Sequence, residues 1–192
     1  MKTKDAIRGY VREKRQELEE DWIADMSDVI FDKLVSEQVF EDAGAVACYI
    51  GYGSEVRTIG IIDRCFALQK KVCVPAYDKQ RSCYRLALIN EDTEMVFGRH
   101  NISEPSDPEW VASEEVDLFI VPGVAFDLAC SRIGYGEGNY DNILSGVAGK
   151  KAALAFDFQV FDEIPADEHD ISMDMILTET RVIAPPARDE RG

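Results

Sequence analysis

A short apolar run followed by a glycine-rich loop, a helical pattern and a second apolar run constrains the fold most. Residues 45–50 read Ala-Val-Ala-Cys-Tyr-Ile and end in Gly51-Tyr52-Gly53-Ser54. A helical pattern then covers 58–69, and residues 71–75 form the second run. Two buried strands joined by a helix run parallel, because the crossover carries the chain back to the same end of the sheet. The sequence therefore predicts a mostly parallel sheet covered by helices.

Similar patterns recur along the rest of the chain. Apolar β-forming runs predict further strands at 84–88, 118–123, 151–156 and 182–183, the first of them at a sheet edge. Apolar periodicity predicts a helix capped by Thr3, a second helix over 27–39 and a third that begins at Asn139. Residues 91–108 are expected to form a polar loop, and 185–192 a loose tail. With no repeat and no linker, we expect a single α/β domain over 1–192.

The charge balance argues against several kinds of partner. The chain of 192 residues has 21 Lys and Arg against 37 Asp and Glu, a formal charge of −16. Contacts with phosphate backbones and anionic lipids need clustered cations, so we expect neither nucleic-acid nor membrane binding. No apolar run reaches the roughly 20 residues of a membrane span, and the charged N-terminus predicts no secretory signal. The five cysteines fit no metal spacing and cannot all pair, which favours a reducing cytoplasm.

In open parallel sheets, ligands bind beyond the carboxyl ends of the strands. Three segments are expected there, at 51–55, 122–140 and 159–174. The second contains the densest functional signal, Arg132-Ile133-Gly134-Tyr135-Gly136-Glu137-Gly138-Asn139-Tyr140-Asp141. Alternate glycines allow backbone N–H groups to converge on an anion, and a helix begins directly afterwards. Arg132 is suited to a phosphate and Asp141 to Mg²⁺. The run matches neither a P-loop nor a dinucleotide fingerprint, so by itself it indicates a phosphate site or a turn without a ligand.

Three other groups of polar residues have both a functional and a structural interpretation. Lys4, Arg8, Arg12 and Arg15 share one helix face, which is either a solvated surface or a clamp for a polyanion such as a nucleoside triphosphate. His169, Asp170 and Asp174 suggest either oxygen ligands for a hard cation or ordinary acidic surface, with His169 structural or an acid–base group. Glu55 suits a substrate amine or ring N–H, or it caps the helix that begins near Thr58.

Taken together, these segments resemble the 5-formyltetrahydrofolate cyclo-ligase family, also called methenyltetrahydrofolate synthetases. Six blocks occur in the family's order along nearly the whole chain. They are Lys4 with Arg8; Ser54-Glu55-Val56 with Thr58; Asn101-Ile102-Ser103-Glu104-Pro105; the run Val-Pro-Gly-Val-Ala-Phe-Asp at 121–127; the run at 132–141; and Phe158-Gln159, Pro165, His169-Asp170, Asp174 and Thr178-Glu179.

The resemblance implies a three-layer α/β/α sandwich with N-terminal helices packed on a mostly parallel sheet. It also implies an ATP- and Mg²⁺-dependent cyclisation of 5-formyltetrahydrofolate to 5,10-methenyltetrahydrofolate, with release of ADP and phosphate. In that reaction the formyl oxygen attacks the γ-phosphate, and N10 of the folate then displaces phosphate from the activated carbon. The implied partners are these small molecules alone, and we expect a monomer.

The resemblance also implies roles for individual residues. Lys4 and Arg8 are expected on ATP phosphates. The nucleotide is expected within Arg132, Ile133, Gly134, Tyr135, Gly136, Glu137, Gly138, Asn139 and Tyr140, of which Arg132 and Tyr140 are the expected catalytic residues. The folate is expected against Ile50, Glu55, Tyr135, Gly136, Glu137, Gly138 and Asn139. Asp141 and Asp174 are the expected Mg²⁺ ligands.

Four positions depart from the family's usual pattern. Cys130 replaces a glycine, Asn139 an aromatic residue and Asn142 a common basic residue, while Glu137 adds a negative charge to the loop. These departures keep open a divergent member that binds nucleotide or folate without turnover. A different enzyme on a related scaffold, such as a sugar-phosphate isomerase or an acyl-CoA transferase, is the third alternative, because a fold does not fix the chemistry.

Overall fold

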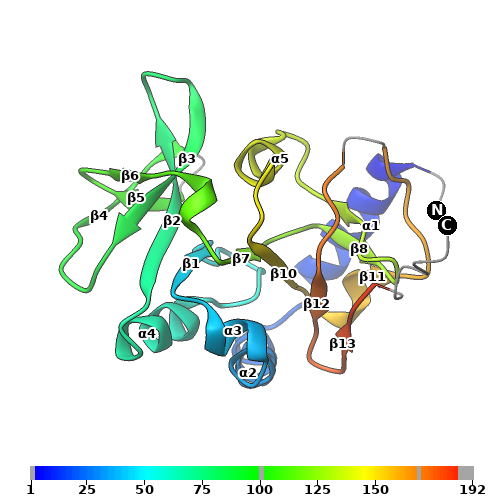
Figure 1. Cartoon of the computed structure of the whole chain (residues 1–192). Helices are drawn as coiled ribbons and strands as arrows, with labels where there is room; N and C mark the ends of the chain where they lie inside the picture. Colours follow the sequence, from blue (N-terminus) through cyan, green and yellow to red (C-terminus); the bar gives the residue numbers. More distant parts are fainter. Residues whose placement is uncertain (1–2, 100–101, 168–169, 186–192) are drawn as a thin grey trace, which may run out of the picture.

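The centre of the molecule is an eight-stranded sheet, seen in a computed structural model that describes residues 3–99, 102–167 and 170–185 (Figure 1). The strand order is β13-β12-β10-β7-β1-β2-β3-β6. The bounds are β1 Ala45–Cys48, β2 Lys71–Asp78, β3 Cys83–Ile89, β6 Glu109–Val111, β7 Leu118–Val121, β10 Lys150–Leu154, β12 Met175–Leu177 and β13 Val182–Ile183. Strands β12, β10, β7, β1 and β2 are mutually parallel, which confirms the predicted mostly parallel sheet.

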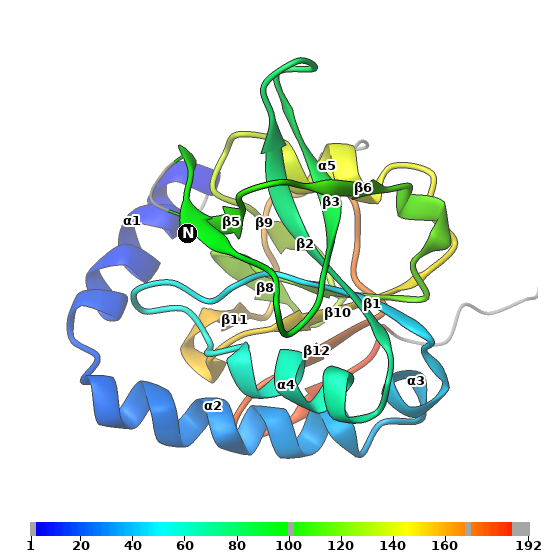
Figure 2. The same ribbon diagram turned by 90° about the vertical axis from the view of Figure 1, so that its left-hand side faces the viewer.

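The predicted strand–helix–strand unit forms as expected. β1 and β2 pair in parallel from Ala45 opposite Lys71, and α4 (Ile59–Ala67) connects them. Before β1, the chain forms α1 (Lys4–Gln16), α2 (Glu20–Val35) and α3 (Gln38–Asp42). The helix α5 (Asn139–Leu144) precedes β10. Figure 2 shows α2, α3 and α4 along one face of the sheet and α5 on the other.

Alternate side chains of β1 and β7 enter two different cores. Val46 and Leu118 face the core that α2 and α4 cover, together with Ile30, Leu34, Ile61 and Cys65. Ala47 and Phe119 face the opposite core, together with Ile143 and Leu144 of α5. Because both faces of these strands are buried, their sequences are continuously apolar rather than alternating. Helices on both faces give the three-layer arrangement.

A second, smaller sheet supports α1. It consists of β11 (Val160–Phe161), β8 (Ala125–Asp127) and β9 (Arg132–Ile133), in that order. Ile7 and Val11 of α1 are buried in one cluster with Val124, Ala125, Ile133 and Ile164. Thr3 caps the helix, since its hydroxyl accepts the Ala6 N–H at 3.2 Å. Thus α2 packs on the central sheet, whereas α1 packs on the small sheet.

Several boundaries differ from the prediction for local reasons. The segment 91–108, expected to be a loop, contains a hairpin of β4 (Met95–Phe97) and β5 (Ser103–Pro105), and β6 pairs with β3, which is therefore not an edge strand. The helix expected over 27–39 begins at Glu20 and ends at Val35. The N-cap residue, Glu19, makes no side-chain capping bond, so the sequence gives no capping signal for the start of this helix. None of the described helices is long and apolar enough to cross a membrane.

Asp127 holds the turn that leads from β8 into Arg132. Its carboxylate is 2% exposed and accepts backbone N–H groups of Ala129 at 3.0 Å, Ser131 at 2.8 Å and Ile164 at 3.2 Å. The carboxylate therefore fixes the start of the glycine-rich segment against the 160–164 strand and loop.

Asp127→Ala leaves these N–H groups without their acceptor. We expect the free energy of unfolding to fall by about 1–3 kcal/mol for each N–H that stays buried and unpaired. Urea denaturation measures the change, and Asp162→Ala, which removes an exposed carboxylate two residues before Ile164, is the control with an expected change within about 0.5 kcal/mol. Equal losses in the two variants would contradict the structural role of Asp127.

Candidate active site

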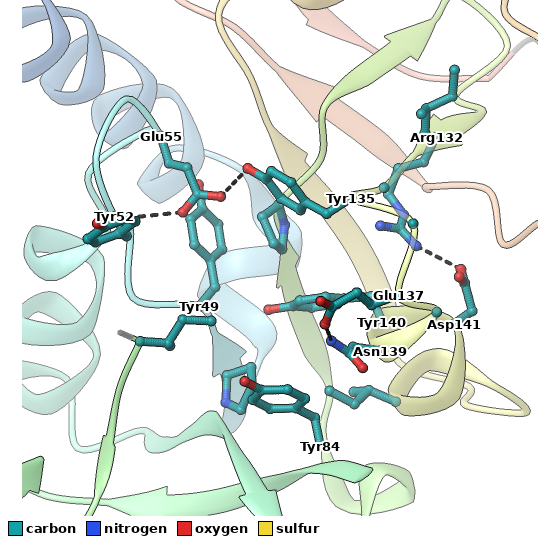
Figure 3. A pocket seen from close by; sticks show the side chains of 18 of the residues that line it. Tyr49, Tyr52, Glu55, Tyr84, Arg132, Tyr135, Glu137, Asn139, Tyr140 and Asp141 are labelled. Atoms are coloured by element: carbon teal, nitrogen blue, oxygen red, sulfur yellow. Dashed lines mark hydrogen bonds and ion pairs between the residues drawn. The ribbon is translucent and has the colours of Figure 1, made fainter. Parts of the chain in front are cut away.

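A cavity of about 700 Å³ opens beyond the carboxyl ends of β1 and β7 (Figure 3). Its walls are α1, the loop 50–55 after β1, Pro75 and Tyr84 of the β2–β3 pair, and the segment 132–141. This place is the usual ligand site of an open parallel sheet, and the volume is within the range of small-molecule pockets. The cavity is therefore the candidate active site.

Three of the four basic residues on the α1 face line this cavity, whereas Arg12 is exposed and does not. Arg8 Nε donates to the Gly134 carbonyl at 3.0 Å, and Arg15 Nη2 donates to the Gly123 carbonyl at 3.0 Å. Lys4 Nζ lies 2.7 Å from Asp167 and 2.6 Å from Asp170. The helix face is thus a cationic wall and not only a solvated surface.

The ion pairs of Lys4 keep its charge in place. Desolvation lowers the pKa of the Lys4 ammonium, but the hydrogen bonds that it donates to Asp167 and Asp170, together with their charges, outweigh it, so the pKa is raised overall. Desolvation raises the pKa of Asp170, but the hydrogen bonds that it accepts from Lys4 and from the Asp167 backbone N–H, together with the nearby positive charges, outweigh it, so that pKa is lowered. Both groups are therefore ionised at neutral pH, and the pair weakens as the pH falls through the Asp170 pKa.

The glycine-rich segment needs its glycines at two positions for different reasons. Gly136 has a φ of +100°, a conformation that L side chains rarely adopt, and a Cβ there would lie 3.7 Å from the Arg8 guanidinium. A Cβ at Gly134 would approach Arg132 Nη1 to 2.8 Å. The glycines thus allow two arginines to approach the loop backbone, and α5 begins directly after this turn.

Arg132 is a buried cation at the floor of the cavity, only 7% exposed. Its Nη2 donates to Asp141 Oδ1 at 2.7 Å, and its guanidinium lies 5.9 Å from the centre of the Tyr140 ring. Burial raises the pKa of the Tyr140 hydroxyl well above its usual range, so the phenol stays protonated. Arg132, Tyr140 and Asp141 therefore form one packed group.

Three buried side-chain polar atoms have no hydrogen-bond partner within the described parts of the chain. They are Arg15 Nε, Arg132 Nε and Tyr140 Oη. All three belong to residues that line the cavity. Buried polar groups are normally paired, so their concentration here is typical of a site that binds a polar ligand.

The opposite wall carries Glu55 among aromatic residues. Tyr135 Oη donates to Glu55 Oε1, and the Tyr52 backbone N–H donates to Glu55 Oε2 at 3.1 Å (Figure 3). Desolvation and the Glu55 carboxylate raise the pKa of the Tyr135 hydroxyl, which stays protonated as a donor. Tyr49 and Tyr84 also line the cavity. A carboxylate held among rings suits a flat, polar ring system with N–H donors.

Most of the expected site residues meet at this one cavity. Lys4, Arg8, Ile50, Glu55 and all residues of 132–141 line it. Asp174 does not belong to the lining: its carboxylate accepts the Lys151 N–H at 2.9 Å and lies 3.5 Å from the Lys150 and Lys151 ammonium groups. The structure therefore does not bring Asp174 to the cavity beside Asp141; instead, the Asp174 carboxylate connects the start of β12 to β10.

Several residues that line the cavity were absent from the expected set, among them Asp170, Arg15 and Tyr49. Asp170 was noted in the acidic cluster, Arg15 in the basic stripe, and Tyr49 only as part of a strand. The signal in the sequence for Arg15 was the three- and four-residue spacing of Lys4, Arg8, Arg12 and Arg15. His169 lies outside the described residues. Within those residues, no group of three His, Cys, Asp or Glu side chains is arranged to hold a metal ion.

The departures in the glycine-rich block have local explanations. Cys130 has a φ of +64°, the left-handed conformation for which a glycine is best suited. Asn139 Nδ2 donates to Glu137 Oε2 at 2.9 Å, so these two unusual residues bind each other at the cavity rim.

Fold and cavity together define an α/β protein with a cationic, glycine-rich anion site beside an aromatic pocket that carries a carboxylate. A sequence model of the 5-formyltetrahydrofolate cyclo-ligase family matches residues 1–179. The chain belongs to this family, whose members are ligases.

Individual relatives agree with that assignment. The NMR structure of Aquifex aeolicus 5,10-methenyltetrahydrofolate synthetase is 33% identical, with a TM-score of 0.86, over 98% of this chain and 95% of the other. The 5-formyltetrahydrofolate cyclo-ligase of Mycolicibacterium smegmatis is 32% identical over 72% of this chain and 75% of its own. The mouse (Mus musculus) cyclo-ligase is 26% identical over 92% of this chain and 93% of its own.

Gly136→Ala tests the backbone requirement of the loop. We expect it to lower the free energy of unfolding by about 1–2 kcal/mol, because a Cβ at positive φ is strained. Gly9→Ala is the matched control: it lies in α1 with open space around the added Cβ, so it should stabilise the protein by about 0.5–1 kcal/mol. Urea denaturation gives both values, and stabilisation by Gly136→Ala would contradict the strained conformation.

Proposed function

We propose that the protein catalyses the ATP-dependent cyclisation of 5-formyltetrahydrofolate to 5,10-methenyltetrahydrofolate, with ADP and phosphate as the other products. The observation that carries the proposal is a single cavity with two unlike walls. Lys4, Arg8 and Arg132 gather at a glycine-rich loop, and Glu55 faces them among aromatic rings. The first wall suits a triphosphate and the second suits a pterin.

The reaction needs alignment and charge neutralisation more than covalent help from the protein. The formyl oxygen forms a bond with the γ-phosphorus while the bond to ADP breaks. N10 then bonds to the formyl carbon, the carbon–oxygen bond breaks, phosphate leaves and N10 loses its proton. Phosphorylation turns a poor leaving oxygen into a good one. Holding both substrates in one cavity supplies the proximity.

Specific side chains fit these steps. Lys4 and Arg8 would bind the nucleotide phosphates, and the buried Arg132 would neutralise charge on the transferred phosphoryl group. The Tyr140 hydroxyl, a buried donor without a partner in the described structure, would donate to an oxygen of the reacting group. Glu55 would accept N–H groups of the pterin, and Ile50 beside it would pack on the ring.

Mg²⁺ is the expected cofactor, and the donor set at the cavity suits it. Mg²⁺ is commonly held by one or two carboxylates together with substrate phosphates and waters. Asp141 ends the loop that the phosphates would occupy, and Asp170 is a second lining carboxylate. When bound, Mg²⁺ would neutralise charge on the phosphates. Asp170 replaces Asp174 in this proposal.

We infer that the monomer is the active unit, because one chain supplies every wall of the cavity. The five cysteines are free thiols, which supports residence in a reducing compartment such as the cytoplasm. Small-molecule substrates are the proposed partners, and neither nucleic acid nor membrane is among them.

The decisive measurement is a spectrophotometric assay for methenyltetrahydrofolate with purified protein, 5-formyltetrahydrofolate and Mg²⁺. We expect product only when ATP is present, with one ADP released for each product molecule. A known cyclo-ligase run alongside controls the assay. Binding of ATP without turnover would instead identify a binding protein, and activity without ATP would identify a different enzyme.

The cationic wall can be tested against a matched control on the same helix. We expect Lys4→Ala and Arg8→Ala each to raise the KM for ATP about 10- to 100-fold, the effect of losing a charged hydrogen bond. Arg12→Ala removes the same kind of charge from the exposed side and should leave KM within about twofold. Normal turnover by Lys4→Ala would contradict the phosphate role and favour another reaction.

A further inference from the structure

Arg15 connects three segments that meet at the cavity. It lies near the end of α1, where Nη2 donates to the carbonyl of Gly123 after β7 at 3.0 Å. Its Nη1 donates to Tyr135 Oη at 2.8 Å, and its guanidinium lies 5.9 Å from the centre of that ring. Nothing in the proposed reaction uses this residue directly.

Its place on the helix relates it to Lys4. The two residues are eleven positions apart, which is close to three full turns, so they share one face about 16 Å apart. Lys4 therefore lines one end of the cavity, and Arg15 lines the other end. Arg12, between them in the same basic stripe, faces away from the cavity.

The contact with Tyr135 sets the direction of a hydrogen bond. The guanidinium can only donate, so it occupies a lone pair of the phenol oxygen. The single phenol proton is then left for Glu55 Oε1, toward which Tyr135 points in Figure 3. Donation from a cation also strengthens the bond that the phenol donates in turn.

Glu55 depends on this bond for its orientation. Its other oxygen accepts the Tyr52 N–H from within the same loop. Tyr135 is therefore the contact that ties the Glu55 side chain to the glycine-rich segment across the cavity. Each Glu55 oxygen accepts one hydrogen bond from the described part of the protein, which leaves a second lone pair on each oxygen for a ligand.

We propose that Arg15 is a positioning residue, which acts through Tyr135 to aim the Glu55 carboxylate at the folate. This inference rests on the proposed function, since it names the side chain that prepares the pterin end of the same site. It assigns to α1 two separate tasks, phosphate binding at Lys4 and Arg8 and orientation of Glu55 at Arg15.

The test is a double-mutant cycle of Arg15→Met and Tyr135→Phe, with Arg12→Met as the matched control. Binding of 5-formyltetrahydrofolate to the resting protein and both KM values are measured for each variant. We expect Arg15→Met to weaken folate binding roughly fivefold to twentyfold and to change the KM for ATP less than about twofold. In the Tyr135→Phe background, Arg15→Met should weaken folate binding by less than about a further twofold, because the phenol hydroxyl that connects Arg15 to Glu55 is already absent. Arg12→Met should leave every value unchanged.

Each other result has a definite meaning. If Arg15→Met raises both KM values equally, or retains its full effect in the Tyr135→Phe protein, the positioning role is wrong. Arg15→Lys is a milder variant in case Arg15→Met does not fold. It keeps the positive charge but cannot donate to Tyr135 and Gly123 in the same geometry, so it should give a smaller loss of folate affinity. Wild-type protein that binds 5-formyltetrahydrofolate without cyclising it overturns the proposed function, while the four dissociation constants still decide this inference. Failure of the wild type to bind it overturns both.

Discussion

The docking of α1 onto the small sheet is the contact on which the cavity depends. The strands of that sheet are two or three residues long, and such short strands have little stability alone. Ile7 and Val11 complete their core, and burial of each such side chain contributes about 1.5–3 kcal/mol. The same helix then presents Lys4, Arg8 and Arg15 to the cavity. Apolar packing on one side of α1 thus determines where its charges lie on the other.

The electrostatics of the cavity are local. A chain with a formal charge of −16 repels anionic substrates at long range, but screening limits that repulsion to roughly 8–10 Å. Within the cavity, Lys4 is held by Asp170 and Arg132 by Asp141. These carboxylates keep the cations oriented before any ligand binds, as the proposed phosphate site requires. The side chains therefore lose their conformational entropy when the protein folds and not when a ligand binds.

Long apolar strands and the glycine-rich run were predictable from the sequence, because each has a local signal. The parallel unit around β1 and the loop 132–141 were both found this way. Strands such as β9 and β11 were missed, because two residues are too short to show any periodicity. The Asp174 carboxylate bonds at the start of a strand and not at the cavity, and this is visible only in the folded chain. Arg15 lay in a visible stripe, but spacing cannot tell a cavity-facing arginine from exposed Arg12.

The pairing of α1 with residues far along the chain has a consequence for synthesis. Lys4 bonds to Asp167 and Asp170, more than 160 positions later, and the small sheet is complete only after Phe161. At about 5–20 residues per second, the ribosome makes α1 some 8–30 seconds before its docking surface exists. Until Phe161 and Ile164 have been made, the core in which Ile7 and Val11 are buried is incomplete. The first helix to be synthesised is thus among the last to dock, and strands of the central sheet can pair before α1 docks on the small sheet.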